Sequence, residues 1–174
     1  MGQLSMTTTE VQNTLDARHN PFIQDIGDAT HTVGSPQAVL ANTEYRLTID
    51  GAARNFVSSP AFFTDRWDDT NDKMTFSTAL NTQTFVSDIG FTFDPSASSA
   101  GIGQVRVYVD DASPKVLRTY TFDYKGSPEP VSIVATYYTG TEAGFDVKND
   151  GIYVTVEFES AGDLYGKTMV IYNT

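Results

Sequence analysis

Apolar and polar residues alternate strictly near the end of the chain, and this pattern predicts a strand with one buried face. The apolar positions are Ile152, Val154, Val156 and Phe158, and the polar positions are Tyr153, Thr155, Glu157 and Glu159. Successive side chains of a strand point to opposite sides, so one side should lie in a core and the other in water. The preceding Asn149-Asp150-Gly151 is a turn signal, because these residues tolerate positive φ.

The last strand, predicted over 167–172, is apolar on both faces. Met169 and Ile171 alternate there with Val170 and Tyr172. A strand of this kind is typically buried on both sides, so we expect it in the middle of a sheet or against a neighbouring subunit. These four residues are therefore interface candidates.

The preceding region is a series of short strands separated by turns, with no long helix. The predicted strands cover 39–49, 54–57, 61–64, 74–78, 84–93, 104–110, 116–123, 131–139 and 145–147. Short strands at this spacing indicate an all-β fold, an antiparallel sandwich or jelly roll over residues 37–174, and they argue against a parallel α/β fold.

Residues 1–36 are more polar and are predicted to form an N-terminal arm. A capping-box sequence at residues 7–10 begins a short helix expected over 8–18. Such a helix is too short to be stable alone in water, so we expect the arm to pack against its own domain or a partner. The apolar contacts expected from the arm are Val11, Leu15 and Phe22.

The composition is typical of a folded β-protein, with 40% hydrophobic and 12% aromatic residues, and the absence of cysteine excludes disulfides. The 22 acidic and 11 basic residues give a formal net charge of −11. Nucleic-acid binding requires clustered basic residues, so we expect no nucleic-acid partner. No apolar run reaches the roughly 20 residues of a membrane helix, and the N-terminus lacks the features of a signal peptide. We therefore expect neither a membrane partner nor secretion.

An acidic loop at residues 65–72 is a candidate calcium site. Its possible oxygen ligands are Asp65, Asp68, Asp69, Asn71 and Asp72. Calcium takes about six to eight oxygen ligands, but the spacing is not that of an EF-hand. The interpretation that we favour is a solvated loop in which Asp and Asn form turns, with no bound metal or cofactor.

Glu157 and Glu159 share one strand face and could form the carboxylate pair of a glycoside hydrolase. We favour the alternative, which is the outward polar face of an outer strand. The two histidines, His19 and His31, lie in the arm without a nucleophile motif nearby, which indicates surface or packing residues rather than a catalytic triad. The sequence therefore predicts a protein that is not an enzyme.

The aromatic residues raise a carbohydrate-binding hypothesis, since exposed flat rings can bind sugars. Trp67 and Tyr137 are the candidate glycan contacts. Aromatic side chains in β-proteins more often lie in a core or an interface, so sugar binding is kept as the alternative.

Two stretches resemble known families. The run 145–156, together with 167–172, resembles the last strand pair of tumour-necrosis-factor/C1q-type (TNF/C1q-type) jelly rolls. The segment 62–74, which contains Trp-Asp-Asp-Thr-Asn-Asp-Lys, is similar to a segment of structural proteins of tailed-phage virions, and the similarity continues loosely through 89–95 and 105–110.

This resemblance implies a trimeric jelly-roll module of a virion, made in the host cytoplasm and bound to the major capsid protein or another virion protein. We therefore expect a non-enzymatic virion structural protein, a capsid-decorating module of the cement or head-fibre type. The first alternative is a carbohydrate- or receptor-binding module of a phage tail or fibre. The second is a jelly-roll glycoside hydrolase.

Overall fold

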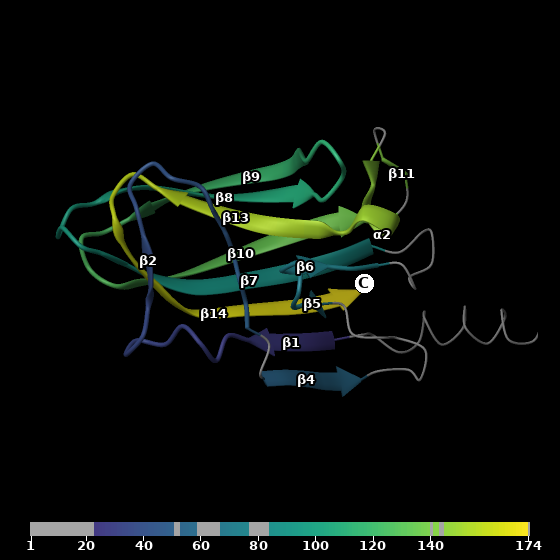
Figure 1. Ribbon diagram of the computed structural model, residues 1–174, viewed down its shortest axis with the longest axis horizontal. Helices are drawn as coiled ribbons and strands as arrows, with labels where there is room; N and C mark the ends of the chain where they lie inside the picture. The colour runs from purple at the N-terminus through teal and green to yellow at the C-terminus, as the bar shows by residue number, and fades with distance from the viewer. Residues whose placement is uncertain are drawn as a thin grey trace, which may run out of the picture.

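Two antiparallel β-sheets pack face to face in the computed structural model, which describes residues 23–50, 53–58, 67–76, 84–139, 141–142 and 145–173 (Figure 1). One short helix, α2 (Val147–Asp150), occurs in this part of the chain. The fold is an all-β jelly-roll sandwich, as the alternating sequence pattern predicted. No helix in the described ranges is long and apolar enough to cross a membrane.

The first sheet, called the β14 sheet below, is built around the last strand of the chain. β14 (Gly162–Asn173) lies between β7 (Thr84–Pro95) and β1 (Ile23–Gly27), and it also pairs with β2 (Gln37–Val39). The two edge strands are β10 (Glu129–Tyr138) and β4 (Ala53–Ser58). The position of β14 confirms the prediction that a strand apolar on both faces lies in the middle of a sheet.

The second sheet, called the β13 sheet, has β13 (Ile152–Phe158) near its centre. Its strands in spatial order are β5 (Trp67–Asp68), β6 (Lys73–Met74), β13, β8 (Gly101–Val109) and β9 (Lys115–Tyr124), and β3 (Tyr45–Arg46) also pairs with β13. A small hairpin joins β11 (Thr141–Glu142) to β12 (Phe145–Asp146) outside both sheets.

Aromatic rings join the two sheets in the core. The ring of Phe93 on β7 stacks on that of Phe158 on β13, with centroids 3.8 Å apart and planes 6° apart. Tyr124 meets both rings edge-on. Met169 and Ile171 are fully buried in this core. Burial of each large apolar side chain contributes roughly 1.5–3 kcal/mol, so the alternating inward positions supply the main stabilisation of the sandwich.

The predicted strand over 39–49 is wrong, because two short strands occupy this region. β2 pairs with β14 and β3 pairs with β13, so the chain leaves one sheet and joins the other between them (Figure 1). The turn between them contains Asn42, which has a φ of +51° and donates its backbone N–H to the Phe158 carbonyl at 2.7 Å. A continuous strand could not serve both sheets without this turn.

The described part of the predicted arm belongs to the sandwich. β1 pairs with β14 on one side and with β4 on the other, so Ile23–Gly27 is part of the β14 sheet. The predicted helix over 8–18, together with Val11, Leu15 and Phe22, lies outside the described residues.

Candidate functional site

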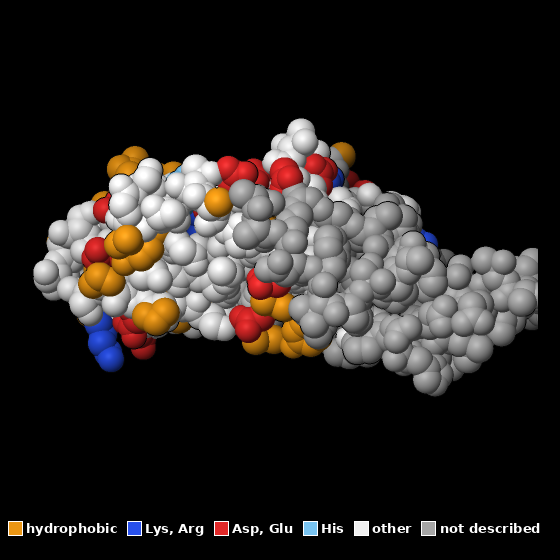
Figure 2. Space-filling model, turned by 90° about the horizontal axis from the view of Figure 1, so that it is seen from below, with side chains coloured by type: hydrophobic (Ala, Val, Ile, Leu, Met, Phe, Trp, Pro, Cys, Tyr) orange, Lys and Arg blue, Asp and Glu red, His pale blue; other side chains and the backbone are white. Residues whose placement is uncertain are grey.

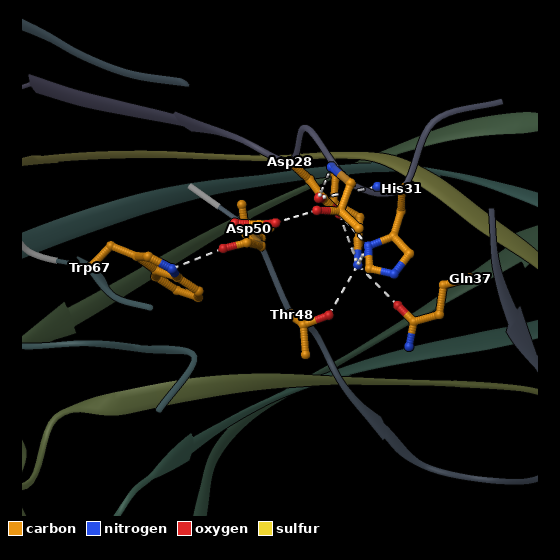
Figure 3. Close-up of polar contacts among 9 residues, drawn as sticks. Asp28, His31, Gln37, Thr48, Asp50 and Trp67 are labelled. Carbon is orange, nitrogen blue, oxygen red and sulfur yellow. Dashed lines mark hydrogen bonds and ion pairs between the residues drawn. The ribbon is translucent and has the colours of Figure 1, made fainter. Parts of the chain in front are cut away.

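The buried side chain of Lys167 on β14 binds the segment that joins β1 to β2. The Lys167 side chain is 0% exposed, and its Nζ lies 3.0 Å from Oδ2 of Asp28, whose side chain is also 0% exposed. The same Nζ lies 2.9 Å from Gln37 Oε1, 3.2 Å from Thr48 Oγ1 and 3.0 Å from His31 Nδ1 (Figure 3). Backbone bonds from Asp28 N–H to the Lys167 carbonyl and from Gly166 N–H to the His31 carbonyl complete the attachment.

The electrostatics of this cluster follow from burial. Burial lowers the pKa of the Lys167 amine from its ordinary value, although hydrogen bonding and attraction to Asp28 oppose that change. Burial pushes the pKa of Asp28 upward, but hydrogen bonds from Lys167, His31 and the Thr30 amide outweigh it and hold that pKa below its ordinary value. Removing one member of such a pair leaves a buried charge, which typically costs about 3–5 kcal/mol.

Neither candidate glycan contact presents its ring to solvent. Trp67 is 4% exposed, and its Nε1 donates to the Ile49 carbonyl at 3.1 Å. Tyr137 is 6% exposed, its hydroxyl meets Met74 Sδ at 3.1 Å, and burial raises the pKa of that hydroxyl. The burial of both rings matches the favoured interpretation of aromatic core residues and gives no support to the alternative of a sugar platform at these two residues.

The acidic loop folds around one of its own carboxylates. Asp68 Oδ1 accepts from the backbone N–H groups of Thr70 and Asn71, and Oδ2 accepts from the Asn71 side-chain amide at 2.7 Å. These bonds hold the pKa of Asp68 below its ordinary value. No group of three or more acidic or histidine side chains is arranged to hold a metal in the described part of the chain, which includes Asp69 and Asp72 but not Asp65. The hydrogen bonds of Asp68 match the prediction that Asp and Asn form turns in this loop.

The two candidate catalytic carboxylates have separate partners. Glu157 forms an ion pair with Arg106 at 2.7 Å. Glu159 is exposed and accepts the backbone N–H of Ile102 at 2.9 Å. Each carboxylate therefore fixes a local structure of the β13 sheet, and the outward polar face is as predicted. The prediction of an outer strand is wrong, because β13 lies between β6 and β8.

The outer face of the β13 sheet is charged and internally paired. Arg106 Nη1 also lies 3.4 Å from Glu44 Oε2, and Lys73 Nζ lies 2.8 Å from Asp110 Oδ2. Tyr108 and Tyr153 stack across neighbouring strands with centroids 5.0 Å apart, and Arg46 lies 3.9 Å above the Tyr153 ring. Ion pairs and ring contacts engage these side chains, and of their polar atoms Arg46 Nη2 is buried without a hydrogen-bond partner. A face of this charged composition is suited to water.

The β9–β10 edge of the sandwich is open and apolar. β9 and β10 are terminal strands of the two sheets and follow one another in the sequence. Their inner faces carry apolar side chains that pack on the core while remaining partly exposed, namely Leu117, Tyr120, Phe122, Val131 and Ile133. The run from Pro130 to Tyr138 contains no charged residue. β9, in contrast, carries Lys115, Arg118 and Asp123. Edge strands are normally protected by charges or covered, so the uncharged part of β10 is a candidate contact surface.

The outer face of the β14 sheet continues this surface. Val134 on β10 is 53% exposed and lies opposite Asp88 on β7, which in turn lies opposite Val170 on β14. Two residues further along β7, Val86 lies opposite Thr136 on β10 and opposite Tyr172 on β14. Strands β1, β7, β10 and β14 contain a single basic residue, Lys167, and its side chain points inward. On the side shown in Figure 2, hydrophobic groups are likewise interspersed with acidic ones, and few basic side chains are visible.

The structure thus divides the four candidate interface residues of the last strand into two pairs. Met169 and Ile171 belong to the core of the single chain, so they are not free to contact another subunit. Val170 and Tyr172 lie on the outer face and are only partly buried. We keep the second pair as interface candidates.

Two features of the site were missed from the sequence. The Lys167 cluster had one signal, a lysine in phase with Met169 and Ile171 on the buried face of an apolar strand. The β9–β10 edge also had a signal, the uncharged run in β10, but its position at the end of a sheet depends on strand order, which alternation does not contain.

Comparisons with known proteins identify the fold. No protein-family model and no curated protein matches the sequence. Murine APRIL matches with a TM-score of 0.51 at 9% identity, over 88% of this chain and 99% of that chain. The PRD1 vertex protein P5 matches with a TM-score of 0.41 at 12% identity, over 88% and 94% of the two chains. The globular domain of zebrafish complement 1qA matches with a TM-score of 0.41 at 10% identity, over 89% and 95%.

These neighbours are TNF- and C1q-type jelly-roll domains, with a vertex protein and virus capsids also among the matches. At identities this low the likeness establishes the fold alone. The chain has an antiparallel jelly-roll sandwich of the TNF/C1q type.

Proposed function

We propose that this chain is a non-enzymatic structural module of a phage particle, a capsid-decorating protein of the cement or head-fibre type that works as a homotrimer. The observation that carries the proposal is the open edge strand β10, which has no charged residue from Pro130 to Tyr138 and whose apolar surface continues onto the outer face of the β14 sheet. The resemblance of segment 62–74 to virion proteins supports the proposed location on a phage particle. The TNF/C1q-type resemblance supports the proposed trimeric state.

Self-association would cover the open edge. An edge strand that is uncharged from Pro130 to Tyr138 is a template for pairing with other chains. A closed symmetric assembly of identical chains covers such surfaces without leaving a free end. A stable interface buries at least about 1,000 Å² in total. The β9–β10 edge together with the outer face of the β14 sheet forms a continuous surface for it, whereas the outer face of the β13 sheet is charged and paired.

We further propose that residues 1–36 contribute to docking on the major capsid protein. β1 pairs with β14 on one side and with β4 on the other, so residues 1–22 would join the sandwich at a strand that is held on both sides. Weak contacts repeated around a particle then add through avidity. Since β1 belongs to the sheet, removal of residues 1–22 is the appropriate deletion. It should leave a folded oligomer that no longer binds capsids, and full binding would refute a role for these residues.

The first experiment is a measurement of molar mass in solution by light scattering. The proposal expects three times the 19.0 kDa of a single chain at micromolar concentration. A mass of one chain across the accessible concentration range would contradict self-association, and a closed oligomer of another number would contradict the trimer alone.

The two alternatives receive no specific support from the described side chains. The candidate sugar platforms, Trp67 and Tyr137, are buried. The candidate acids, Glu157 and Glu159, are each held by a structural partner. We therefore propose binding to other protein chains, without catalytic turnover, as the function.

A further inference from the structure

We propose that Lys167 and Asp28 become joined by an intramolecular isopeptide bond, formed by the protein itself with His31 as the proton-transfer group. Lys167 Nζ, Asp28 Oδ2 and His31 Nδ1 form a triangle with sides of 3.0, 2.9 and 3.0 Å. The amine is a nucleophile, the carboxyl group is its acceptor, and the imidazole contacts both. This inference does not depend on the self-association proposed above.

The backbone holds the two reacting groups in place. β1 and β14 are adjacent antiparallel strands, with Gly27 opposite Thr168. One residue further, the Asp28 N–H donates a backbone hydrogen bond to the Lys167 carbonyl at 2.9 Å, which extends the pairing to the two reacting residues. Groups fixed within van der Waals distance react far faster than the same groups free in solution. The local fold therefore supplies the proximity that an uncatalysed condensation lacks.

The site also excludes solvent from the reacting atoms. The side chains of Lys167 and Asp28 are both 0% exposed. Because water is a product of amide formation, a site that excludes water favours condensation over hydrolysis. Burial lowers the pKa of the Lys167 amine, which increases the share of the neutral, nucleophilic form.

The reaction begins from the ion pair, which is the resting state. Transfer of one proton along the Nζ–Oδ2 hydrogen bond gives a neutral amine and a carboxylic acid. The next step uses the tautomer of His31 that carries its proton on Nε2, in place of the one that donates Nδ1–H to Asp28, so that Nδ1 can accept a proton. The nitrogen lone pair of Lys167 attacks Cγ of Asp28, His31 Nδ1 removes a proton from that nitrogen, and the same proton is delivered to the departing hydroxyl. A C–N bond forms, a C–O bond breaks, and one water molecule leaves. No oxidant, metal or cofactor enters this balance.

The surroundings suit both the transfer step and the product. His31 is 25% exposed while its two partners are not, so it is the member of the triangle that connects the site to solvent. The product amide keeps one N–H on Nζ. Gln37 Oε1 lies 2.9 Å from Nζ, so it can accept a hydrogen bond from that N–H. The other groups close to the amine are Thr48 at 3.2 Å and the more distant charge of Asp72. The bond would covalently close the chain between β1 and β14.

The test is the intact mass of the purified full chain. The proposal expects a mass lower than the sequence mass by one water molecule. Tryptic digestion should then give residues 19–46 joined to residues 149–174, since a linked Lys167 is not cleaved. The full sequence mass, together with release of a free 168–174 peptide after prolonged incubation, would overturn the proposal.

Two variants separate the chemistry from folding. Lys167→Arg retains the positive charge but has no amine able to form this bond, so it should show the full sequence mass. His31→Gln preserves a polar side chain and leaves both reacting groups, so it should fold, as judged by circular dichroism, and should form the link at least tenfold more slowly. Linkage of a folded His31→Gln variant at the wild-type rate would overturn the role of His31.

Discussion

The rings of Phe93 and Phe158 stack in parallel, 3.8 Å apart, and join the two sheets at the centre of the sandwich. Phe93 comes from β7 of the β14 sheet, and Phe158 comes from the end of β13. Both side chains are almost fully buried. This pair therefore connects the layers at a point where no backbone hydrogen bond can do so.

Replacement of Phe158 by alanine should lower the free energy of unfolding by about 3–5 kcal/mol, the usual cost of removing a buried aromatic ring and leaving a cavity. Urea denaturation followed by fluorescence would measure the change. The matched control is Val116→Ala, since Val116 is 46% exposed and should change stability by no more than about 0.5 kcal/mol. Equal effects of the two changes would contradict the assigned core.

The sequence predicted which residues of β13 and β14 are buried, because alternation along a strand identifies an inward face. It did not predict the contact between Phe93 and Phe158, since alternation is local and does not state which strands face each other. It also missed the break between β2 and β3, because Tyr45 and Leu47 continue the alternation while the chain passes from one sheet to the other.

The candidate site was less predictable for the same reason. Glu157 was correctly expected on an outward face, but its partner Arg106 is far away in the sequence. The meeting of Lys167, Asp28 and His31 depends on the pairing of the first described strand with the last. The burial of Trp67 likewise depends on the path of the distant segment that supplies the Ile49 carbonyl.

Gly103 allows the Phe122 ring to cross β8. A Cβ at this position would lie 2.4 Å from Phe122 Cζ, so one of the two must move. Gly103→Ala should therefore destabilise the protein by about 1–3 kcal/mol, measured by urea denaturation. Combining it with Phe122→Leu should give a loss smaller than the sum of the two single changes, and simple additivity would show that the ring is not the obstacle.

Glu44 should contribute to acid sensitivity. Burial pushes the pKa of Glu44 upward, but hydrogen bonds from Thr155 and Tyr108 and the charge of Arg106 hold it below its ordinary value of 4.5. The unfolded chain then takes up the proton first as the pH falls, so this contribution is present above about pH 4.5 and is lost on acidification through the folded-state pKa.

Glu44→Gln should therefore reduce the difference in urea midpoint between pH 7 and pH 3, by the equivalent of less than about 1 kcal/mol, as is usual for a partly exposed ion pair. Thr155→Val, which removes one hydrogen bond to Glu44, should act in the same direction with a smaller effect. A larger pH dependence in Glu44→Gln would show that the sign is wrong.

Trp67 should act in stability and not in sugar binding. Trp67→Phe preserves a buried aromatic ring but leaves the Ile49 carbonyl without its indole donor. An unpaired buried polar group costs about 1–3 kcal/mol, so the urea midpoint should fall by a corresponding amount. Glycan-array signals should be the same for variant and wild type, and a sugar signal lost only in the variant would restore the carbohydrate hypothesis.

Val134 is the most exposed apolar side chain on β10 and lies at the junction of the open edge with the outer face of the β14 sheet. Val134→Lys places a charge at this junction, and a charged edge strand resists pairing with other chains. If this surface mediates self-association, the variant should dissociate at protein concentrations at least about tenfold higher than the wild type, which corresponds to about 1.4 kcal/mol. Its unfolding midpoint as a single chain should change little, because the side chain points outward.

The control for this variant is Ser113→Lys, which adds the same charge to an exposed turn between β8 and β9. Analytical ultracentrifugation of the three proteins over a range of concentrations would compare them directly. A Val134→Lys variant with the wild-type mass at every concentration would exclude this surface and leave the outer face around Tyr172 as the next one to test. Dissociation of both lysine variants would contradict the assignment to this surface, because an added lysine lowers the net negative charge of −11 and should not by itself weaken association between copies.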